Sequence, residues 1–201
     1  MLSKTNLFIG ATIFLLIAVS AYFAWEWNRD RTISVTVTER VDRPALSFSF
    51  AFPSGPDALS FFESAPAEQD DVALQNVILL AETKTFQNPE DNADRGTISI
   101  FVFDWTEAMS DTTAGLDSRS KLATWAAAHP GYSTVTETTE FTPTEIDGAP
   151  AITYTSRGEL AREIFLSRYD KKVYLFVSQY QAPGDTIDTA FDTVIGSVLF
   201  E

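Results

Sequence analysis

The sequence predicts an α+β fold in which a central antiparallel β-sheet is sandwiched between helices and preceded by one N-terminal transmembrane helix. Strand-like segments follow one another between two helical segments instead of alternating with helices, and this order is typical of antiparallel sheets with helical layers. In front of them lies an uncharged segment, residues 7–25. As a helix it spans roughly 28 Å, which is enough for one membrane crossing.

Aromatic residues end the apolar segment. We expect Trp25 and Trp27 at the membrane interface, because amphipathic rings favour the headgroup layer. A cleaved signal peptide is the alternative, since residues 19–21, Val-Ser-Ala, form an acceptable cleavage site before Tyr22. The apolar run continues beyond that site, so the sequence favours an uncleaved signal anchor behind a short tail, residues 1–6.

The charges that flank the apolar segment favour the opposite membrane orientation from the one usual for exported, anchored proteins. Lys4 precedes the segment, whereas Arg29, Arg31, Arg40 and Arg43 follow it, and the positive-inside rule taken literally would keep the domain in the cytoplasm. Long domains translocate largely regardless of charge, however. We therefore expect a single-pass protein of the cell membrane whose C-terminal domain lies outside the cytoplasm.

The composition argues against several classes of function. Against 14 basic residues stand 28 acidic ones, for a net charge of −14, and such a surface repels phosphate backbones, so nucleic acid is not an expected partner. The chain has no cysteine, which excludes disulfides, thiolate metal sites and a cysteine nucleophile. Its single histidine argues against structural zinc, and no cofactor is expected.

Residues 26–45 are predicted to form a charged stalk, and residues 46–201 the folded domain. Within the stalk, Ile33, Val35 and Val37 alternate with serine and threonine. This alternation suits an edge strand that pairs with the domain.

The domain opens with a strand that has one buried side. Leu46, Phe48, Phe50 and Phe52 share one face of it, while small residues share the other. Residues 53–56, Pro-Ser-Gly-Pro, are predicted to turn the chain out of the sheet at Pro53.

A helix and a hairpin are expected next. Residues 57–63 suit a short helix, and the apolar run 72–82 leads into a second strand. Residues 96–105 are apolar on both faces in the middle, which is typical of a central strand. The turn formers in residues 88–96 suit a hairpin between the two strands.

Two amphipathic helices flank the remaining strands. The first is predicted over residues 114–129, where Pro130 and Gly131 stop it. The second closes the chain, capped by Asp185 or Thr186 and carrying a wide apolar stripe. Between them we expect an antiparallel meander of four strands, over residues 132–141, 149–156, 161–169 and 173–180.

This order and several local motifs resemble the PsbP-like superfamily, which includes the extrinsic PsbP proteins of photosystem II, their bacterial relatives and a nuclear-import factor that binds the Ran GTPase. The resemblance rests on FSFAFPSG at residues 48–55, EIDGAPAITYT at 145–155, the amphipathic closing helix and FDTVIGSVLF at 191–200. It implies a sheet between helical layers, in proteins that mostly bind or stabilise other proteins. It brings no active site that could be transferred residue by residue.

The sequence departs from the photosynthetic members in two respects. A tryptophan often expected soon after the proline of the opening strand is absent, and Leu59, Phe61 and Phe62 stand in that region. An N-terminal span is also not the plant arrangement. The resemblance therefore favours a bacterial, membrane-anchored relative over a photosystem subunit.

Few residues suggest catalysis, and no catalytic residue is assigned. His129 is the only histidine, and its place at a helix C-terminus already has an electrostatic explanation. Ser118 and Lys121 have the Ser-x-x-Lys spacing of serine-lysine acyl enzymes. The Ser-Asp-Asn and Lys-Thr-Gly motifs that accompany it in those enzymes are absent, so a polar first helical turn explains both residues.

One loop offers oxygen ligands. Glu90, Asp91 and Asp94 are weak calcium candidates, because Ca²⁺ takes carboxylate oxygens. Their spacing does not match an EF-hand loop, and the same residue types are typical of a solvated hairpin tip. The sequence predicts no metal site beyond this one.

Together these features predict a non-enzymatic, membrane-tethered extracytoplasmic domain that binds a protein of the envelope or stabilises an assembly. The alternative is an envelope hydrolase of the Ser/Lys type, or a small-ligand-binding protein, with a pocket between sheet and helix.

Overall fold

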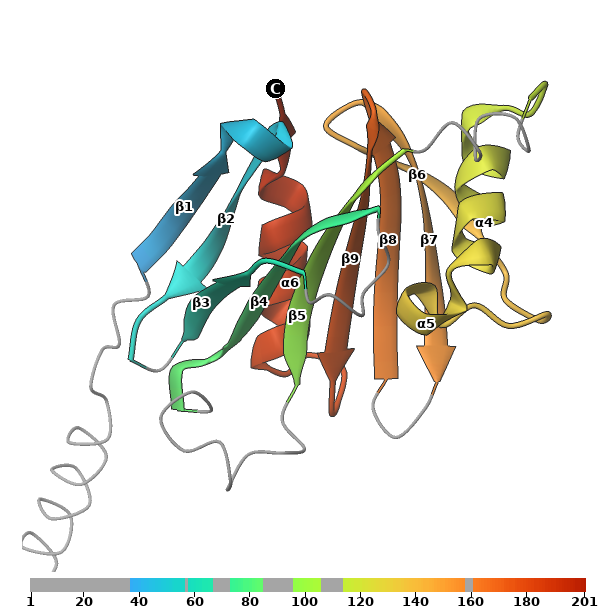
Figure 1. The fold of residues 1–201 in the computed structure, drawn as a ribbon. Helices are drawn as coiled ribbons and strands as arrows, with labels where there is room; N and C mark the ends of the chain where they lie inside the picture. The colour runs from blue at the N-terminus through green and yellow to red at the C-terminus, as the bar shows by residue number, and fades with distance from the viewer. Residues whose placement is uncertain (1–36, 57, 67–72, 85–95, 106–113, 158–160) are drawn as a thin grey trace, which may run out of the picture. The chain divides into compact units, whose positions relative to one another are not determined.

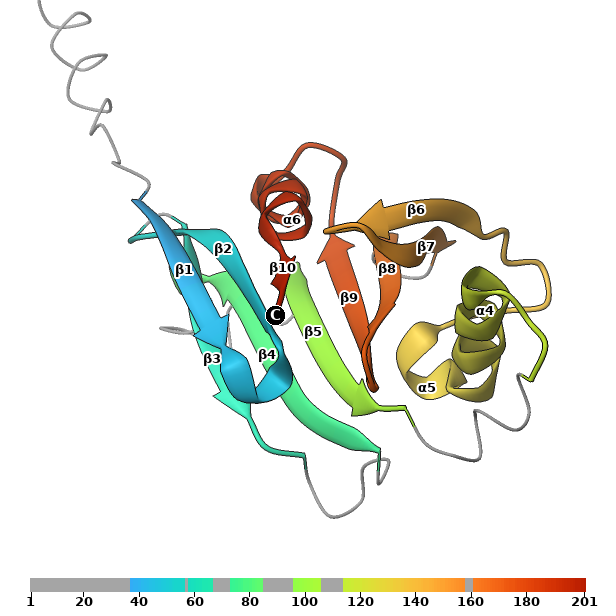
Figure 2. The same cartoon turned by 90° about the horizontal axis from the view of Figure 1, so that it is seen from above.

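The computed structural model describes residues 37–56, 58–66, 73–84, 96–105, 114–157 and 161–201 (Figure 1). The described strands form one sheet, and helices pack on both of its sides (Figure 2). In chain order the elements are β1 Val37–Arg43, the 3₁₀ helix η1 Pro44–Leu46, β2 Phe48–Ser54, β3 Leu59–Ser64, β4 Leu74–Glu82, β5 Thr97–Asp104, α4 Ser118–Ala128, α5 Pro130–Ser133, β6 Thr142–Ile146, β7 Ala149–Arg157, β8 Ala161–Tyr169, β9 Lys172–Tyr180, α6 Thr186–Ser197 and β10 Leu199–Phe200.

The ten strands form one sheet in the order β1-β2-β3-β4-β5-β9-β8-β7-β6, with β10 beside β2. All neighbours are antiparallel except β2 and β3, which share a single parallel pair, Ser54 with Leu59. Strands β7, β8 and β9 form the last three strands of the predicted meander. The strand that pairs with β7 on its other side, β6, lies outside the predicted residues 132–141. Strand β5 lies between β4 and β9, which confirms that residues 96–105 form a central strand.

One side of the sheet packs against α6. Phe48, Phe50 and Phe52 are almost completely buried there, together with Phe191 of α6, so the three phenylalanines of β2 face the core as the sequence predicts. Helix α6 contacts β2, β9, β4 and β5, and Figure 2 shows it on the opposite side of the sheet from α4 and α5. Its N-cap is Asp185, whose carboxylate accepts from the Asp188 N–H at 2.9 Å.

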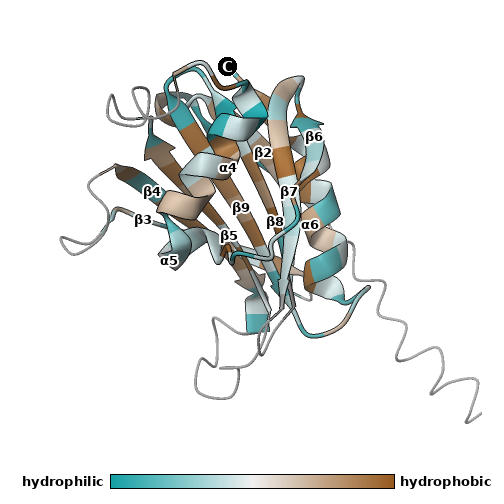
Figure 3. Cartoon of the chain, turned by 90° about the vertical axis from the view of Figure 1, so that its right-hand side faces the viewer, coloured by the Kyte–Doolittle hydropathy of each residue, from teal (hydrophilic) through white to brown (hydrophobic). Residues whose placement is uncertain are grey.

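The other side of the sheet packs against α4 and α5. Leu122 and Trp125 of α4 are buried against Phe103, Ile164 and Leu166. Figure 3 shows α4 and α5 across this face, with hydrophobic residues on the strands behind them. The sheet therefore has helices on both sides, as an α+β fold with a central antiparallel sheet requires.

The start of the described chain belongs to the sheet. Residues 37–43, within the predicted stalk, form β1 and pair with β2 along its full length, at one edge of the sheet. Pro53 does not begin a turn: it lies inside β2 opposite Thr38, and β2 continues to Ser54. A proline is tolerated there because β2 has no strand beside Pro53 on its other side.

The helix expected over residues 57–63 is wrong, because Leu59–Ser64 form β3. Six residues of β3 pair with β4, which gives their backbone groups hydrogen-bond partners. A helix as short as the predicted one would be only marginally stable by itself. The segment alternates well enough for a strand: Leu59 is buried, whereas Phe62 is exposed.

The strand expected over residues 132–141 is also wrong. Pro130 stops α4 but also begins a second helix, α5, since a proline suits the first position of a helix. The Ser133 hydroxyl donates to the Ala126 carbonyl at 2.6 Å and joins α5 to α4. After Thr134, in a left-handed conformation, the chain makes a turn, and β6 begins only at Thr142. Helix α4 likewise starts at Ser118, later than predicted.

Candidate functional site

Ser118 and Lys121 lie in the first turns of α4, where Asp117 caps the helix. The Asp117 carboxylate accepts from the Arg119 and Ser120 N–H groups at 2.9 and 3.1 Å and from the Ser120 hydroxyl at 2.6 Å. These hydrogen bonds, that of the Ser120 hydroxyl above all, lower the pKa of Asp117. Ser118 is exposed, and no hydrogen bond joins it to Lys121. The structure thus shows the polar helix start that the sequence suggested, without an activated nucleophile.

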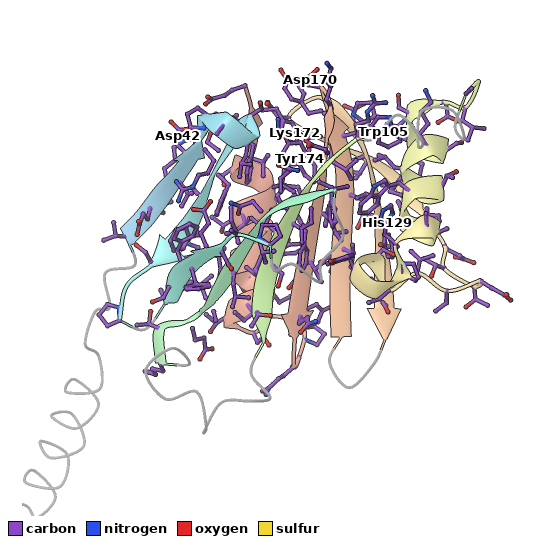
Figure 4. The ribbon with its side chains drawn as sticks, viewed as in Figure 1. Asp42, Trp105, His129, Asp170, Lys172 and Tyr174 are labelled. Carbon is purple, nitrogen blue, oxygen red and sulfur yellow. The ribbon has the colours of Figure 1, made fainter. Side chains whose placement is uncertain are left out.

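His129 lies at the opposite end of α4. The helix has 11 residues, so roughly 16 Å separates its two ends, and His129 cannot act on Ser118. The ring stacks on Trp125 with 4.2 Å between centroids, and Nδ1 lies 2.8 Å from the Trp125 carbonyl oxygen. Figure 4 shows His129 beside α4, away from the labelled residues of β9. Packing on Trp125 and Phe103 accounts for this histidine.

A polar hollow of about 410 Å³ lies beside the turn that follows α5. Hydroxyl groups dominate its lining, and some of them bond one another: the Thr139 hydroxyl accepts from the Thr136 N–H at 2.9 Å and lies 3.2 Å from the Thr136 hydroxyl. Glu140 supplies the one carboxylate of the lining. The lining residues are Thr136, Thr138, Thr139, Glu140, Thr155 and Ser156. The sequence prediction missed this hollow because it treated residues 132–141 as a strand.

Three carboxylates approach one another between β8 and α6. Burial raises the pKa of Glu163, and the negative charges of Asp188 and Asp192 raise it further. Within the described ranges, no group of three or more His, Cys, Asp or Glu side chains is arranged to hold a metal ion. The calcium candidates Glu90, Asp91 and Asp94 lie outside the described residues, so their prediction stays untested.

Strands β3, β4 and β5 carry an uncharged surface on the side of the sheet that faces α4 and α5. Phe62 is 54% exposed there, and it pairs with Leu79, which pairs with Ser99. None of the residues of this surface carries a charge, although the chain as a whole carries −14. We call it the β3–β5 surface; its members are Ser60, Phe62, Ser64, Val77, Leu79, Thr97, Ser99 and Phe101.

The β3–β5 surface borders the helices without lying beneath α4. Helix α4 makes most of its strand contacts with β7 and β8, and Tyr132 of α5 packs on Phe101 at the border of this surface, with 5.5 Å between ring centroids. Phe62, Val77 and Leu79 remain partly or largely exposed in the described part of the chain. Sequence reasoning could not find this surface, because it depends on which strands are neighbours.

The predicted membrane segment, residues 7–25, and the interface residues Trp25 and Trp27 lie outside the described residues. In the part of the chain that the structure describes, no helix is both long and apolar enough to cross a membrane. Tethering through residues 7–25 stays a prediction.

Comparisons with known proteins bear on the fold. A solution structure of cyanobacterial PsbP (CyanoP) from Synechocystis sp. PCC 6803 superimposes with a TM-score of 0.53 at 14% sequence identity, and the match covers 85% of this chain and 96% of that one. A protein from Bacteroides thetaiotaomicron VPI-5482 matches with a TM-score of 0.46 at 10% identity, over 81% of this chain and 48% of its own. No protein-family model and no curated protein matches the sequence. The chain is similar to cyanobacterial PsbP in fold, which confirms the predicted resemblance at that level.

Proposed function

We propose that this PsbP-like domain is a non-enzymatic, membrane-tethered binding domain outside the cytoplasm that holds a protein partner through its β3–β5 surface. The observation that carries the proposal is the exposed Phe62 within an uncharged stretch of sheet. Exposed aromatic residues in an uncharged setting, on an otherwise charged protein, are typical of sites of protein association.

Two further observations support binding over catalysis. Ser118 has no hydrogen bond to Lys121, its partner in the Ser-x-x-Lys spacing, and His129 lies at the opposite end of α4. The polar hollow offers hydroxyls and one carboxylate, and its threonines already bond one another. A cyanobacterial PsbP has the same fold, and the resemblance stated above implies binding or stabilising roles for such domains.

The partner is a protein of the cell envelope whose contact surface is also weakly charged. A desolvated carboxylate facing the β3–β5 surface would have no cation to pair with among its residues, and an unpaired buried charge is costly. Aromatic and aliphatic side chains on the partner would instead bury Phe62 and Leu79.

Membrane extracts that contain the full-length chain provide the test. The wild-type chain should retain its partner through detergent extraction, and Phe62→Glu should lose it, because the introduced carboxylate is buried without a counter-charge. Thr193→Glu places the same charge on an exposed position of α6 and should retain the partner. Equal retention by both variants would refute the proposed surface.

Fractionation tests the tether independently. The full-length chain should sediment with membranes, and protease added to intact spheroplasts should digest its C-terminal domain. Protection of the domain until the membrane is lysed would place it in the cytoplasm and contradict the proposed orientation.

A further inference from the structure

We propose that two copies of this chain pair edge to edge through β1, as antiparallel strands related by a two-fold axis at Val41. Strand β1 forms one end of the strand order, and within the described part of the chain it pairs with β2 alone. Figure 1 shows β1 at the margin of the sheet, with no other coloured element beyond it.

The free backbone groups of this edge can be identified. The Ser54 hydroxyl of β2 donates to the Val37 carbonyl at 3.0 Å, so that carbonyl faces β2. Because backbone direction alternates along a strand, the odd-numbered residues of β1 face β2, and Thr38, Arg40 and Asp42 direct their N–H and C=O groups outward. An unpaired row of this kind is a template for another strand.

The opposite edge of the sheet, strand β6, is protected against pairing with a further strand, whereas β1 is not. Strand β6 contains Pro143, which has no N–H to offer a further strand. Strand β1 contains no proline, and its register with β2 is continuous over all seven residues without a bulge.

The charges of β1 are self-complementary in one register. Residues 39–43 read Glu-Arg-Val-Asp-Arg. When Val41 lies opposite Val41 of the second copy, Glu39 faces Arg43 and Arg40 faces Asp42, and the two-fold axis repeats both pairs. Every charged residue of β1 then has an opposite charge across the strands, which stabilises the pairing.

Neighbouring registers lack this property. The backbone groups that face outward belong to even-numbered residues of β1. A second copy can therefore pair only where even-numbered residues lie opposite even-numbered residues, so the register shifts in steps of two residues. One step in one direction places Arg40 opposite Arg40, and one step in the other places Asp42 opposite Asp42. Like charges directly opposite each other are destabilising, so the charge pattern selects the register centred on Val41.

The Arg40–Asp42 pair is the more informative of the two. Arg43 already pairs with Glu63 at 2.7 Å, so its contribution across the dimer is shared. Arg40 donates to the hydroxyl of Ser49, which leaves its charge unpaired. Arg40 and Asp42 are both exposed, and Figure 4 shows Asp42 at the upper end of β1. Strand pairing alone buries less surface than stable dimers usually do, so we expect association in the micromolar range or weaker.

Charge reversal tests the pairing in the full-length chain, by sedimentation velocity over a concentration series. Asp42→Arg and Arg40→Asp should each weaken dimerisation roughly tenfold or more, since each turns two attractive pairs into repulsive ones. The double variant Arg40→Asp/Asp42→Arg should recover wild-type affinity. Glu137→Arg makes the same charge change as Asp42→Arg on an exposed turn and should dimerise like the wild type.

A second measurement does not depend on the stability of those variants. The chain has no cysteine, so Arg40→Cys and Asp42→Cys proteins each carry one thiol. Mixed together in air, with oxygen as the oxidant of the two thiols, they should form a disulfide-linked dimer faster than either protein alone, because residue 40 lies opposite residue 42. A wild-type monomer at all concentrations, single charge variants that associate like the wild type, or cross-linking no faster in the mixture would each overturn the proposal.

Discussion

The Ser197 hydroxyl bonds the backbone of Ala51 across 146 positions of sequence: it accepts from the Ala51 N–H at 2.8 Å and lies 3.1 Å from the Ala51 carbonyl oxygen. Strand β2 has neighbours on that side only at its ends, β10 at Phe48 and Ser49 and β3 at Ser54. The last residue of α6 thus satisfies backbone groups in the middle of β2 that no strand reaches.

Replacing this hydroxyl should destabilise the fold. In Ser197→Ala the Ala51 N–H, on a residue only 8% exposed, loses its partner, and an unsatisfied buried group costs about 1–3 kcal/mol. The free energy of unfolding in urea should fall by that amount. Ser197→Thr keeps the hydroxyl and should lie closer to the wild type; equal losses in both variants would show that the hydrogen bond is not the cause.

Gly96 should tolerate no side chain. It is buried at the start of β5, and a Cβ there would overlap the Gln179 carbonyl oxygen of β9 and lie 3.1 Å from Ile187 Cγ1. Gly96→Ala therefore forces the β5–β9 pair or α6 to shift, at a cost of roughly 1–3 kcal/mol or more.

A matched glycine gives the control. A Cβ on Gly196 of α6 meets nothing within 4 Å, and alanine is favoured over glycine in a helix by about 0.5–1 kcal/mol. Thermal unfolding should show a lower midpoint for Gly96→Ala and an unchanged or higher one for Gly196→Ala. A lower midpoint for both would mean that the contacts of Gly96 do not decide the outcome.

The sequence was most informative where the local pattern and the tertiary contacts agree. Strand β5 is apolar on both faces in its middle and lies between β4 and β9, and α6 has both its apolar stripe and its Asp185 cap. The sequence was misleading at β3 and α5. There the conformation depends on contacts with other segments, the pairing of β3 with β4 and the hydrogen bond from Ser133 to Ala126, and local propensity does not report such contacts.

The candidate surfaces show the same limit. In the sequence Phe62 is one apolar residue among many, and only the sheet order places it beside Leu79 and Ser99. The charge pattern of residues 39–43 likewise suggests self-pairing only once β1 is known to be an edge strand. Exposure of a strand face or edge follows from topology, which a single sequence does not supply directly.

Two buried tyrosines should make the fold sensitive to alkaline pH. The Tyr174 hydroxyl donates to the Leu46 carbonyl at 2.7 Å, and that of Tyr154 to the Ser133 carbonyl at 2.9 Å. Burial raises the pKa of both above the ordinary 10.0, and Asp170 raises that of Tyr174 further. The neutral form is favoured in the folded state, so this stabilisation is full below pH 10 and is lost as pH rises beyond it.

Urea unfolding at pH 7 and at about pH 10.5 measures this loss. The wild type should lose stability between the two values, and Tyr174→Phe should lose less, because it has no phenol to ionise. At pH 7 Tyr174→Phe should be destabilised by about 1 kcal/mol for the missing hydrogen bond. An undiminished alkaline loss in both Tyr174→Phe and Tyr154→Phe would exclude these phenols as its source.

Glu163 should destabilise the fold at neutral pH. It lies on β8 in register with Thr155 of β7 and Ser178 of β9, while Asp188 and Asp192 approach from α6. Burial, followed by these two charges, raises its pKa above the ordinary 4.5. A raised folded-state pKa contributes stability below pH 4.5 that is lost as pH rises through the folded value. At pH 7 the carboxylate is therefore charged at a cost.

Glu163→Gln removes that charge while it keeps the shape of the side chain. Its free energy of unfolding at pH 7 should exceed that of the wild type, by less than about 1 kcal/mol because Glu163 is partly exposed and solvent screens its neighbours. The gain should disappear below about pH 4, where the wild-type carboxyl is protonated in both states. Glu137→Gln, on an exposed turn, should show no such gain. A Glu163→Gln protein less stable than the wild type at pH 7 would mean that the carboxylate makes a favourable contact that outweighs Asp188 and Asp192.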